Sequence, residues 1–529
     1  MAEIVKWRKF FFIVWGILST VYLPLILRFI WGNHDWDYLN KTVTLSDGFF
    51  ESRYSQHLFN SFLFDGQILP VFFLLWGAAA LVVSGIMISY YLKVDKEKRV
   101  VWGLTLFIGL NPYLFGTFYY LMILNAMTFW PIVAIWLLMM TEKGFSWRRL
   151  FLGGSGYGIL WGGYPALFSF SAGAFCLRQI IESMNGKLNW SGSFKKGFFL
   201  AMQVCIGFVI FKLINYYLVR IGVVNTDMYN LKLRDFSEIL EAIIKSFYTA
   251  FGQFGTQYLY LEKTYSVLLI GGIIGAVLMW GRKRNKVLTL VWFAALLLFS
   301  QFAFILAQGA DIARFRIEYW TRFPICLFIL YFLLIEKKRW LRNFVSLWMV
   351  LLIGLFVQTD FWIQKNWHLG FESNLKYQSR VKDRIITDER FNPQTKYIAY
   401  NFGQVNFSNK FYGTVPNDIE KSMELENLHT FDIAVVKNMF WGTDIQPIGV
   451  GVVKLDEKNF LYYSYVKGFR AINPKGSLPA IRKWIYTEAQ PYPSKDFIYL
   501  DNNFMVVVLK ETDFYKNREN LLVSFEGNL

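Results

Sequence analysis

The sequence contains little charge and little cysteine. Only 18% of its 529 residues are charged, whereas soluble domains carry about 25%, so an ordinary water-soluble enzyme is not expected. The three cysteines, Cys176, Cys205 and Cys326, all fall inside apolar runs, which excludes a disulfide framework and a cysteine-based zinc motif. The sequence has no nucleotide-binding P-loop, kinase signature or nucleophile elbow. An NTP-driven pump is therefore not expected either.

Apolar and aromatic residues are abundant instead. Hydrophobic residues make up 55% of the chain and aromatic residues 19%, with a mean hydropathy of +0.32. Disordered chains are poor in aromatic residues, so disorder is excluded. The sequence predicts a multi-span α-helical membrane protein with about 11 transmembrane helices, because eleven apolar stretches are long enough, or nearly so, to cross about 30 Å of hydrocarbon. These stretches are 10–31, 68–92, 100–116, 120–140, 150–163, 165–181, 198–221, 265–281, 287–307, 323–336 and 344–358.

The distribution of basic residues predicts the orientation of the chain. The formal net charge is +17. If the N-terminus is cytoplasmic, the segments on its side hold more than twice as many Lys and Arg residues as the opposite loops. This is the positive-inside pattern of membrane proteins, so the basic charge indicates topology and no nucleic-acid partner is expected. The first apolar run is expected to be a retained helix, because no small-residue cleavage site follows it.

The composition divides the chain into two domains. Residues 1–358 carry the predicted spans, and an odd number of crossings places residues 359–529 on the extracytoplasmic side. In that tail, polar residues and short alternating runs replace the long apolar stretches. The tail is predicted to be an α+β domain, with a helix over 371–386 and strands over 396–401 and 451–455. Two further strands, 497–500 and 504–510, flank Asp501-Asn502-Asn503 and predict a hairpin.

The first outer loop, residues 32–67, gathers the groups that could perform chemistry. It contains Asp35 and Asp37, with Glu51, His34 and His57 in the same loop. A general base that deprotonates a sugar hydroxyl is a carboxylate or a histidine within hydrogen-bond reach, and Asp35 and Asp37 could act as base and as orienting group. A solvated loop with helix-capping aspartates is the alternative. The two histidines with nearby carboxylates leave a divalent ion open, but no tight ligand spacing supports one, so no metal or other cofactor is expected.

Arginine residues form a second group of candidates. Arg314 and Arg316 lie in a predicted outer loop and point the same way if the backbone is extended. Guanidinium groups bind phosphate well because their planar donors engage two oxygens, so this pair is expected to grip a phosphate at the membrane surface. Arg28, near the end of the first apolar run, has the alternative of snorkelling to lipid headgroups.

Glycines recur at intervals of four inside a predicted span. Gly154, Gly158 and Gly162 form two overlapping G-x-x-x-G units. In membranes such units allow close approach between helices. They do not follow a soluble strand, so they do not predict a nucleotide-binding loop.

Several of these motifs together resemble the GT-C superfamily of membrane glycosyltransferases, and more closely its GtrII-like group of serotype-converting glucosyltransferases. The first loop of that group typically reads Asn-x-Asp-Asp, a glycine, and then Gly-Arg. In this chain the similar residues are Asn33-His34-Asp35, Gly48 and Ser52-Arg53. The adjacent aspartates of the group are replaced by Asp35-Trp36-Asp37 and its Gly-Arg by Ser52-Arg53, which leaves open which aspartate is the base. Similar elements elsewhere are Asn111-Pro112, Gly163-Tyr164-Pro165, the arginine-bearing loop and the Val-rich strand 504–509.

The resemblance implies an inverting glycosyltransferase in the bacterial inner membrane. Its partners would be a polyprenyl-phosphate-linked sugar donor, with glucose as the sugar, a lipid-linked or cell-surface glycan acceptor, and membrane lipids. Asp35 or Asp37 would be the catalytic base, and Arg53 with Arg314 and Arg316 would bind the donor phosphate. The expected substrate-binding residues are His34, Glu51 and His57. A polytopic transporter or flippase, and a scaffold whose outer domain binds a partner protein, are the alternatives from other functional classes.

Overall fold

The computed structural model describes the chain as two compact units, considered separately below. Unit 1 comprises Met1–Phe29 and Tyr38–Gln364, and unit 2 comprises Ile30–Asp37 and Lys365–Leu529. The residues described are 2–27, 42–49, 53–111, 114, 121–164, 166–187, 189–222, 287–296, 343, 346–347, 349–361, 364–365, 368, 383–385, 387–391, 397–402, 451–454, 462–464, 478–490, 494–501 and 504–508.

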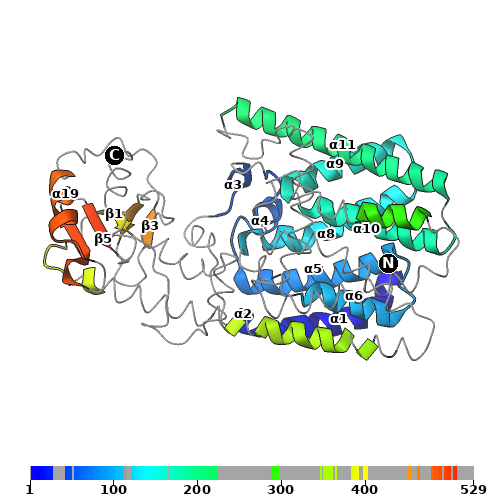
Figure 1. Ribbon diagram of the computed structural model, residues 1–529, viewed down its shortest axis with the longest axis horizontal. Coiled ribbons are helices and arrows are strands. Elements are labelled where there is room, and N and C mark those ends of the chain that lie inside the picture. The colour runs from blue at the N-terminus through cyan, green and yellow to red at the C-terminus, as the bar shows by residue number, and fades with distance from the viewer. Residues whose placement is uncertain are drawn as a thin grey trace. The chain divides into compact units, whose positions relative to one another are not determined.

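Unit 1 is built from helices (Figure 1). In the figure α5 lies next to α6 and α8, and α11 runs along α9. Two further helical segments, Val287–Leu296 and Met349–Phe361, belong to this unit. The helices are α1 (Ala2–Val21), α2 (Leu23–Leu27), α3 (Leu45–Phe49), α4 (Leu58–Leu63), α5 (Pro70–Tyr91), α6 (Lys98–Gly109), α8 (Leu121–Glu142), α9 (Trp147–Gly163), α10 (Ala166–Met184) and α11 (Trp190–Arg220).

Three helices of the described part are long and apolar enough to cross a membrane: Pro70–Tyr91, Leu124–Glu142 and Trp190–Arg220. The described residues of the other stretches predicted as spans between residues 10 and 221 are mostly helical, and parts of 287–307 and 344–358 are helical. The predicted spans 265–281 and 323–336 lie outside the described residues. The chain is therefore mostly helical, as predicted, and its eleven crossings remain a prediction.

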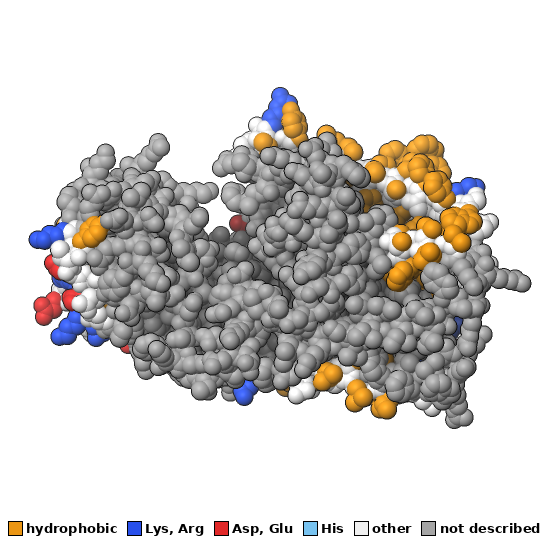
Figure 2. Space-filling view, in the orientation of Figure 1, with side chains coloured by type: hydrophobic (Ala, Val, Ile, Leu, Met, Phe, Trp, Pro, Cys, Tyr) orange, Lys and Arg blue, Asp and Glu red, His pale blue; other side chains and the backbone are white. Residues whose placement is uncertain are grey.

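The apolar side chains of this unit do not all point inward. Figure 2 shows hydrophobic side chains gathered on the outward faces of α11 and of Met349–Phe361. In an aqueous protein such patches would be unusually large, whereas contact with lipid satisfies them. Phe194, Phe198, Val209, Leu213, Tyr216 and Tyr217 on α11 are more than half exposed, as are Val350 and Leu351 on the second helix.

Five serine and threonine hydroxyls inside the apolar helices are satisfied locally. Each donates to the backbone carbonyl four residues earlier, which removes the cost of an unpaired hydroxyl at membrane depth. The pairs are Ser84 with Ala80, Ser89 with Gly85, Thr105 with Val101, Thr128 with Leu124 and Ser171 with Leu167, at 2.7 to 3.0 Å.

The glycine repeat of α9 packs against α11, as the G-x-x-x-G spacing predicts. A Cβ atom at Gly207 of α11 would lie 2.7 Å from the backbone nitrogen of Gly158, and a Cβ at Gly158 would lie 3.3 Å from the carbonyl of Gly207. Only residues without a side chain allow backbones to approach this closely. Gln203 adds a polar link across these helices, because its side chain donates to the carbonyl of Arg149 at 2.9 Å.

The first helix begins earlier and ends earlier than the apolar run 10–31. It begins at Ala2, because the hydrogen-bonded helix includes the polar residues that precede the apolar segment. Hydropathy marks only the apolar segment. It is interrupted after Val21 and resumes as α2 at Leu23. Pro24 explains the interruption, since proline lacks the N–H that would bond the carbonyl four residues earlier.

The side-chain amide of Gln364 bridges this interruption. Its Nε2 donates to the carbonyl of Val21 at 3.0 Å, and its Oε1 accepts from the N–H of Leu25 at 3.4 Å. Val21 and Leu25 are four residues apart, so these are the groups that an unbroken helix would join directly. A residue about 340 positions later in the chain therefore takes part in the hydrogen bonding of the first helix.

Unit 2 contains a five-stranded sheet of order β3-β2-β1-β5-β4. The strands are β1 (Tyr397–Phe402), β2 (Gly451–Lys454), β3 (Tyr462–Ser464), β4 (Ile498–Asp501) and β5 (Phe504–Val508). The central pair, β1 and β5, is parallel with Ile398 opposite Phe504, and the other neighbours are antiparallel. Helix α19 (Leu478–Thr487) places the ring of Trp484 5.5 Å from that of Tyr499 on β4.

The strands predicted in the tail are confirmed. β1 and β2 lie at the predicted 396–401 and 451–455, and β4 pairs antiparallel with β5 with Asp501 opposite Phe504. The two positions between them, 502 and 503, match a two-residue hairpin connection. Most of the predicted helix 371–386 lies outside the described residues, although 383–385 are helical.

Candidate functional site

A segment of loop one is built into one end of the helix bundle of unit 1. Residues 53–55 lie on the C-terminal end of α9, where Tyr54 Oη donates to the carbonyl of Gly158 at 2.6 Å and the N–H of Ser55 donates to that of Gly162 at 2.9 Å. Ser55 Oγ donates to the carbonyl of Ile159. The last four carbonyls of a helix lack partners within the helix, and Ser55 supplies a donor for one of them, that of Gly162.

Glycine at the end of α9 is required by this docking. A Cβ at Gly162 would overlap the ring of Tyr54, and a Cβ at Gly163 would lie 2.8 Å from Trp130 Nε1 and 3.2 Å from Ser55 Oγ. The third glycine of the repeat therefore receives a loop, whereas Gly154 and Gly158 face α11. The sequence motif predicted a close approach between helices, but not that its third glycine contacts loop one instead of a helix.

Arg53 is held in place by two neighbours. Its Nη1 donates to Gln56 Oε1 at 3.3 Å, and its guanidinium lies over the ring of Tyr164, 5.7 Å from the centroid. A cation over an aromatic face is attracted by the ring quadrupole. Arg53 is thus fixed by Gln56 of loop one and by Tyr164, the residue directly after α9. A planar guanidinium is suited to binding phosphate oxygens.

His57 is buried beside Gln56 and does not lie at the surface. The imidazole is 1% exposed, and its Nε2 is 3.5 Å from Nε2 of Gln56. Gln56 therefore connects His57 to Arg53. The predicted role of His57 in contacting a substrate stays a prediction, and in this conformation the imidazole is placed to support Gln56.

Two buried amides attach the same segment to α8. Asn125 Nδ2 donates to Asn60 Oδ1 at 2.7 Å, and both residues are 1% exposed. The backbone carbonyl of Asn60 accepts from the N–H groups of Phe64 and Gly66, which closes the turn after α4. Buried polar side chains that are bonded in this way fix a single arrangement of the segment. Arg53, Gln56, His57, Asn60 and Asn125 are called the loop-one site below.

Asp47, another carboxylate of loop one, caps a helix. Its Oδ2 accepts from the N–H of Thr44 at 2.7 Å and from Thr44 Oγ1 at 2.9 Å, at the start of α3. The contact from the Thr44 N–H is one half of a capping box, in which a side chain in the first turn reaches back to the backbone N–H of the N-cap residue. The alternative interpretation of loop one as a region of helix-capping aspartates therefore holds for Asp47.

The other predicted site residues cannot be placed. His34, Asp35, Asp37, Glu51, Arg314 and Arg316 lie outside the described residues. Of the predicted set, the structure brings together Arg53 and His57 through Gln56. Among the described residues, no group of three or more His, Cys, Asp or Glu side chains is arranged to hold a metal ion.

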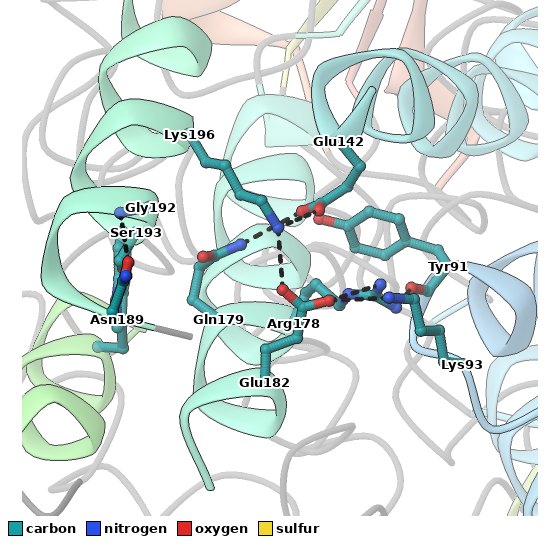
Figure 3. Close-up of polar contacts among 11 residues, drawn as sticks. Tyr91, Lys93, Glu142, Arg178, Gln179, Glu182, Asn189, Gly192, Ser193 and Lys196 are labelled. Atoms are coloured by element: carbon teal, nitrogen blue, oxygen red, sulfur yellow. Dashed lines mark hydrogen bonds and ion pairs between the residues drawn. The ribbon is translucent and has the colours of Figure 1, made fainter. Parts of the chain in front are cut away.

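The structure also contains a group of charged residues that sequence reasoning missed. Lys196 Nζ lies 2.6 Å from Glu142 Oε2 and 2.9 Å from Glu182 Oε2 (Figure 3). Glu182 Oε1 lies 2.8 Å from Arg178 Nη2 and 3.0 Å from Lys93 Nζ. The five residues come from α8, α10, α11 and the end of α5. They are called the charged cluster below.

The charged cluster joins four helices through two carboxylates. Arg178 also donates to the carbonyl of Tyr91 at the end of α5, and its guanidinium lies 5.6 Å from the centroid of the Tyr91 ring. Gln179 Nε2 donates to Glu142 Oε1 at 3.2 Å. The spacing of Arg178 and Glu182, four residues apart on one helix, was the available sequence signal. The positive-inside pattern accounts for the cations here but gives no sign of the acids that pair with them.

Glu182 follows the predicted span 165–181 by one residue. Its surroundings favour the ionised form of the carboxyl group over the protonated form. Burial raises its pKa, but the hydrogen bond from Lys196, the charge of Arg178 and the hydrogen bond from Lys93 outweigh burial, so the pKa is lowered to about 2. Glu182 therefore stays ionised at neutral pH and holds the cations around it.

The backbone at Lys93 is unusual for a lysine. Its φ is +58°, in the left-handed region that glycine adopts most easily. The N–H groups of Lys93 and Val94 donate to the carbonyls of Tyr90 and Ser89 at 3.0 and 2.9 Å, which is the Schellman pattern that ends many helices and usually has glycine at this position. A lysine here accepts backbone strain, and its Nζ reaches Glu182.

The sequence was compared with family models, with curated proteins and with solved structures. No family model, no curated protein and no solved structure matches it. The geometry described above and the sequence motifs are therefore the basis of the functional argument.

Proposed function

We propose that this chain is an inverting GT-C-type glycosyltransferase of the bacterial inner membrane. It moves a sugar, glucose by its resemblance to the GtrII-like group, from a polyprenyl-phosphate donor to a lipid-linked or cell-surface glycan on the extracytoplasmic face. The observation that carries this proposal is the placement of Arg53, which a network of buried loop-one residues holds at one end of the bundle.

The position of the loop-one site supports an outer, membrane-surface reaction. Asn125 and Glu142 mark opposite ends of α8, and 17 residues separate them, which corresponds to about 26 Å at 1.5 Å per residue. This is close to the thickness of the hydrocarbon layer. The charged cluster, with its cations, lies at the end predicted to be cytoplasmic, and the loop-one site lies at the other end. A lipid-linked donor would present its phosphate at that second end.

The chemistry follows from the residue types of the loop. Asp35 or Asp37 takes the proton from an acceptor hydroxyl, and the oxygen then attacks the anomeric carbon of the donor. The bond between that carbon and the phosphate oxygen breaks, and polyprenyl phosphate leaves. The configuration at the anomeric carbon of the transferred sugar is inverted. Arg53, with Arg314 and Arg316, stabilises the charge that grows on the phosphate, while His34, Glu51 and His57 contribute to substrate binding directly or through their neighbours.

The proposal is tested with purified protein in vesicles that contain a polyprenyl-phosphate-linked sugar. Arg53→Ala is expected to reduce kcat/KM for the donor by about 100-fold, the scale of one lost electrostatic contact to a developing anion. Arg148→Ala is the matched control, because Arg148 is exposed at the N-terminal end of α9. Equal activity of the two variants would overturn the role of Arg53.

The base and the reaction class need separate experiments. Asp35→Asn and Asp37→Asn are expected to abolish transfer individually or together, and near wild-type turnover in the double variant would refute the assignment. Release of free polyprenyl phosphate separates a transferase from a flippase, since a flippase moves its lipid without consuming it. A scaffold would tolerate neutralised loop-one carboxylates and would lose its function when 359–529 is deleted.

A further inference from the structure

The break in the first helix is bridged by the side chain of Gln364, the last residue of unit 1 in the sequence. An ordinary proline kink leaves one backbone carbonyl without a helical partner, and water or nearby hydroxyls satisfy it. Here the amide of Gln364 lies between the carbonyl of Val21 and the N–H of Leu25 and bonds both. We propose that Gln364 is a positioning residue that fixes the direction in which the first helix enters loop one.

Glutamine is chemically suited to this task. The gap offers one acceptor, the Val21 carbonyl, and one donor, the Leu25 N–H, and a primary amide supplies the complementary donor and acceptor on a single rigid plane. Gln364 is 1% exposed, so water does not compete for these groups. The same Nε2 also donates to the backbone carbonyl of Asp360 at 3.2 Å, which orients the amide from its own helix.

The surroundings of the amide are packed and buried. Tyr22, at the break, is 2% exposed and its hydroxyl donates to the carbonyl of Gly109 at 2.6 Å. Phe356, two turns before Gln364, lies 5.5 Å from the ring of Phe107 on α6. The break is therefore held between α6 and the helix Met349–Phe361, and it is not a free hinge.

Chain continuity connects this clamp to the proposed chemistry. Loop one begins five residues after Leu27, the last residue of α2, and Asp35 and Asp37 follow Leu27 by eight and ten residues. The direction of α2 sets the direction in which the chain leaves the described part of unit 1, ahead of the segment that carries the proposed base. The inference rests on the proposed function, since the positioned groups are those assigned to the transfer reaction.

Two substitutions test the clamp. Gln364→Leu removes both hydrogen bonds at similar size. Gln364→Glu retains them only when the carboxyl is protonated, because the acid then has one donor and one acceptor in the arrangement of the amide. Gln358→Glu is the matched control, since Gln358 lies in the helix Met349–Phe361, six residues before Gln364, and is exposed.

The first measurement is hydrogen–deuterium exchange of the peptide covering residues 20–27, which needs no activity. Gln364→Leu is expected to exchange faster than wild type in this peptide, and Gln358→Glu is expected to match wild type. Unchanged exchange in Gln364→Leu would overturn the clamp.

The second measurement is the transfer assay. Gln364→Leu is expected to lower kcat by about 100-fold, the scale of a misplaced catalytic group, with little change in KM for the donor. Gln364→Glu is expected to lose activity relative to Gln358→Glu as the pH rises. Normal kcat despite fast exchange would overturn the positioning role. Absence of transfer by the wild type would instead refute the proposed function, and the exchange result would still decide the clamp.

Discussion

The ring of Tyr54 occupies the space that a side chain at Gly162 would need. Tyr54 Oη donates to the carbonyl of Gly158, and the ring lies against the last turn of α9. The contact joins loop one to a helix about 100 residues later in the chain. It ties the position of Arg53, the preceding residue, to the geometry of the bundle.

Gly162→Ala is expected to destabilise the protein. The added methyl group overlaps the Tyr54 ring, which is held by its own hydrogen bond, and overpacking of this kind costs about 1–3 kcal/mol. Thermal unfolding of the purified protein in detergent measures the effect. Gly16→Ala is the control, because no atom lies within 4 Å of a Cβ at Gly16, and alanine raises helix stability there by up to about 1 kcal/mol. An equal unfolding temperature for the two variants would contradict the packing described.

Substitutions at Lys93 separate backbone strain from the ion pair. Lys93→Ala and Lys93→Gly both lose the contact with Glu182, but only glycine relieves the positive φ. Lys93→Gly is therefore expected to be more stable than Lys93→Ala by about 1 kcal/mol. The Lys93 side chain is 64% exposed, and an exposed ion pair contributes about 0–1 kcal/mol. Relative to wild type, glycine should thus be close to neutral in chemical or thermal unfolding.

The opposite order would contradict this account of Lys93. If Lys93→Ala were more stable than Lys93→Gly, the positive φ at this position would not destabilise a residue that carries a side chain. A large loss in both variants would show that the ion pair with Glu182 outweighs its exposure.

The sequence predicted the helices better than their ends. Apolar length located both ends of α5 and α8 within two residues, because the side chains that favour lipid also form the helix. It located the end of α11 within one residue, but α11 begins eight residues before the predicted span, in a more polar segment. The first helix begins before the predicted span 10–31 and is interrupted inside it. Its beginning lies in a polar segment that hydropathy does not mark, and its break depends on Pro24, which a count of apolar residues overlooks.

The candidate site was predictable only in its local parts. Loop one was singled out by its charged residues, and helix-capping aspartates were the alternative for it, without Thr44 or Asp47 being identified as a cap. The partners of Arg53 and Asn60, which are Tyr164 and Asn125, come from elements brought together by packing. Likewise Glu142 and Glu182 are 40 residues apart, and nothing in their local sequence shows that Lys196 lies between them.

The charged cluster makes stability depend on pH through Glu182. The folded-state pKa of about 2 is lower than the value of about 4.3 for an unperturbed glutamate. Protons therefore bind the unfolded chain more readily as the pH falls, and the stabilisation by this carboxylate is complete above the unfolded pKa and is lost as the pH falls toward 2. Glu182→Gln is expected to lower stability at neutral pH by about 3 kcal/mol, the scale for breaking one side of a buried ion pair, because Arg178 and Lys196 lose their partner.

The comparison of pH profiles decides whether Glu182 has this role. Unfolding is measured from pH 7 to pH 2.5 in wild type, in Glu182→Gln and in Glu97→Gln, whose native side chain is exposed before α6. The gap between wild type and Glu182→Gln is expected to be widest at neutral pH and to narrow below about pH 4, while Glu97→Gln follows wild type throughout. A gap that stays constant down to pH 2.5 would show that the glutamine variant loses packing and not the charge, since protonation of the wild-type carboxylate would then make no difference to the cluster.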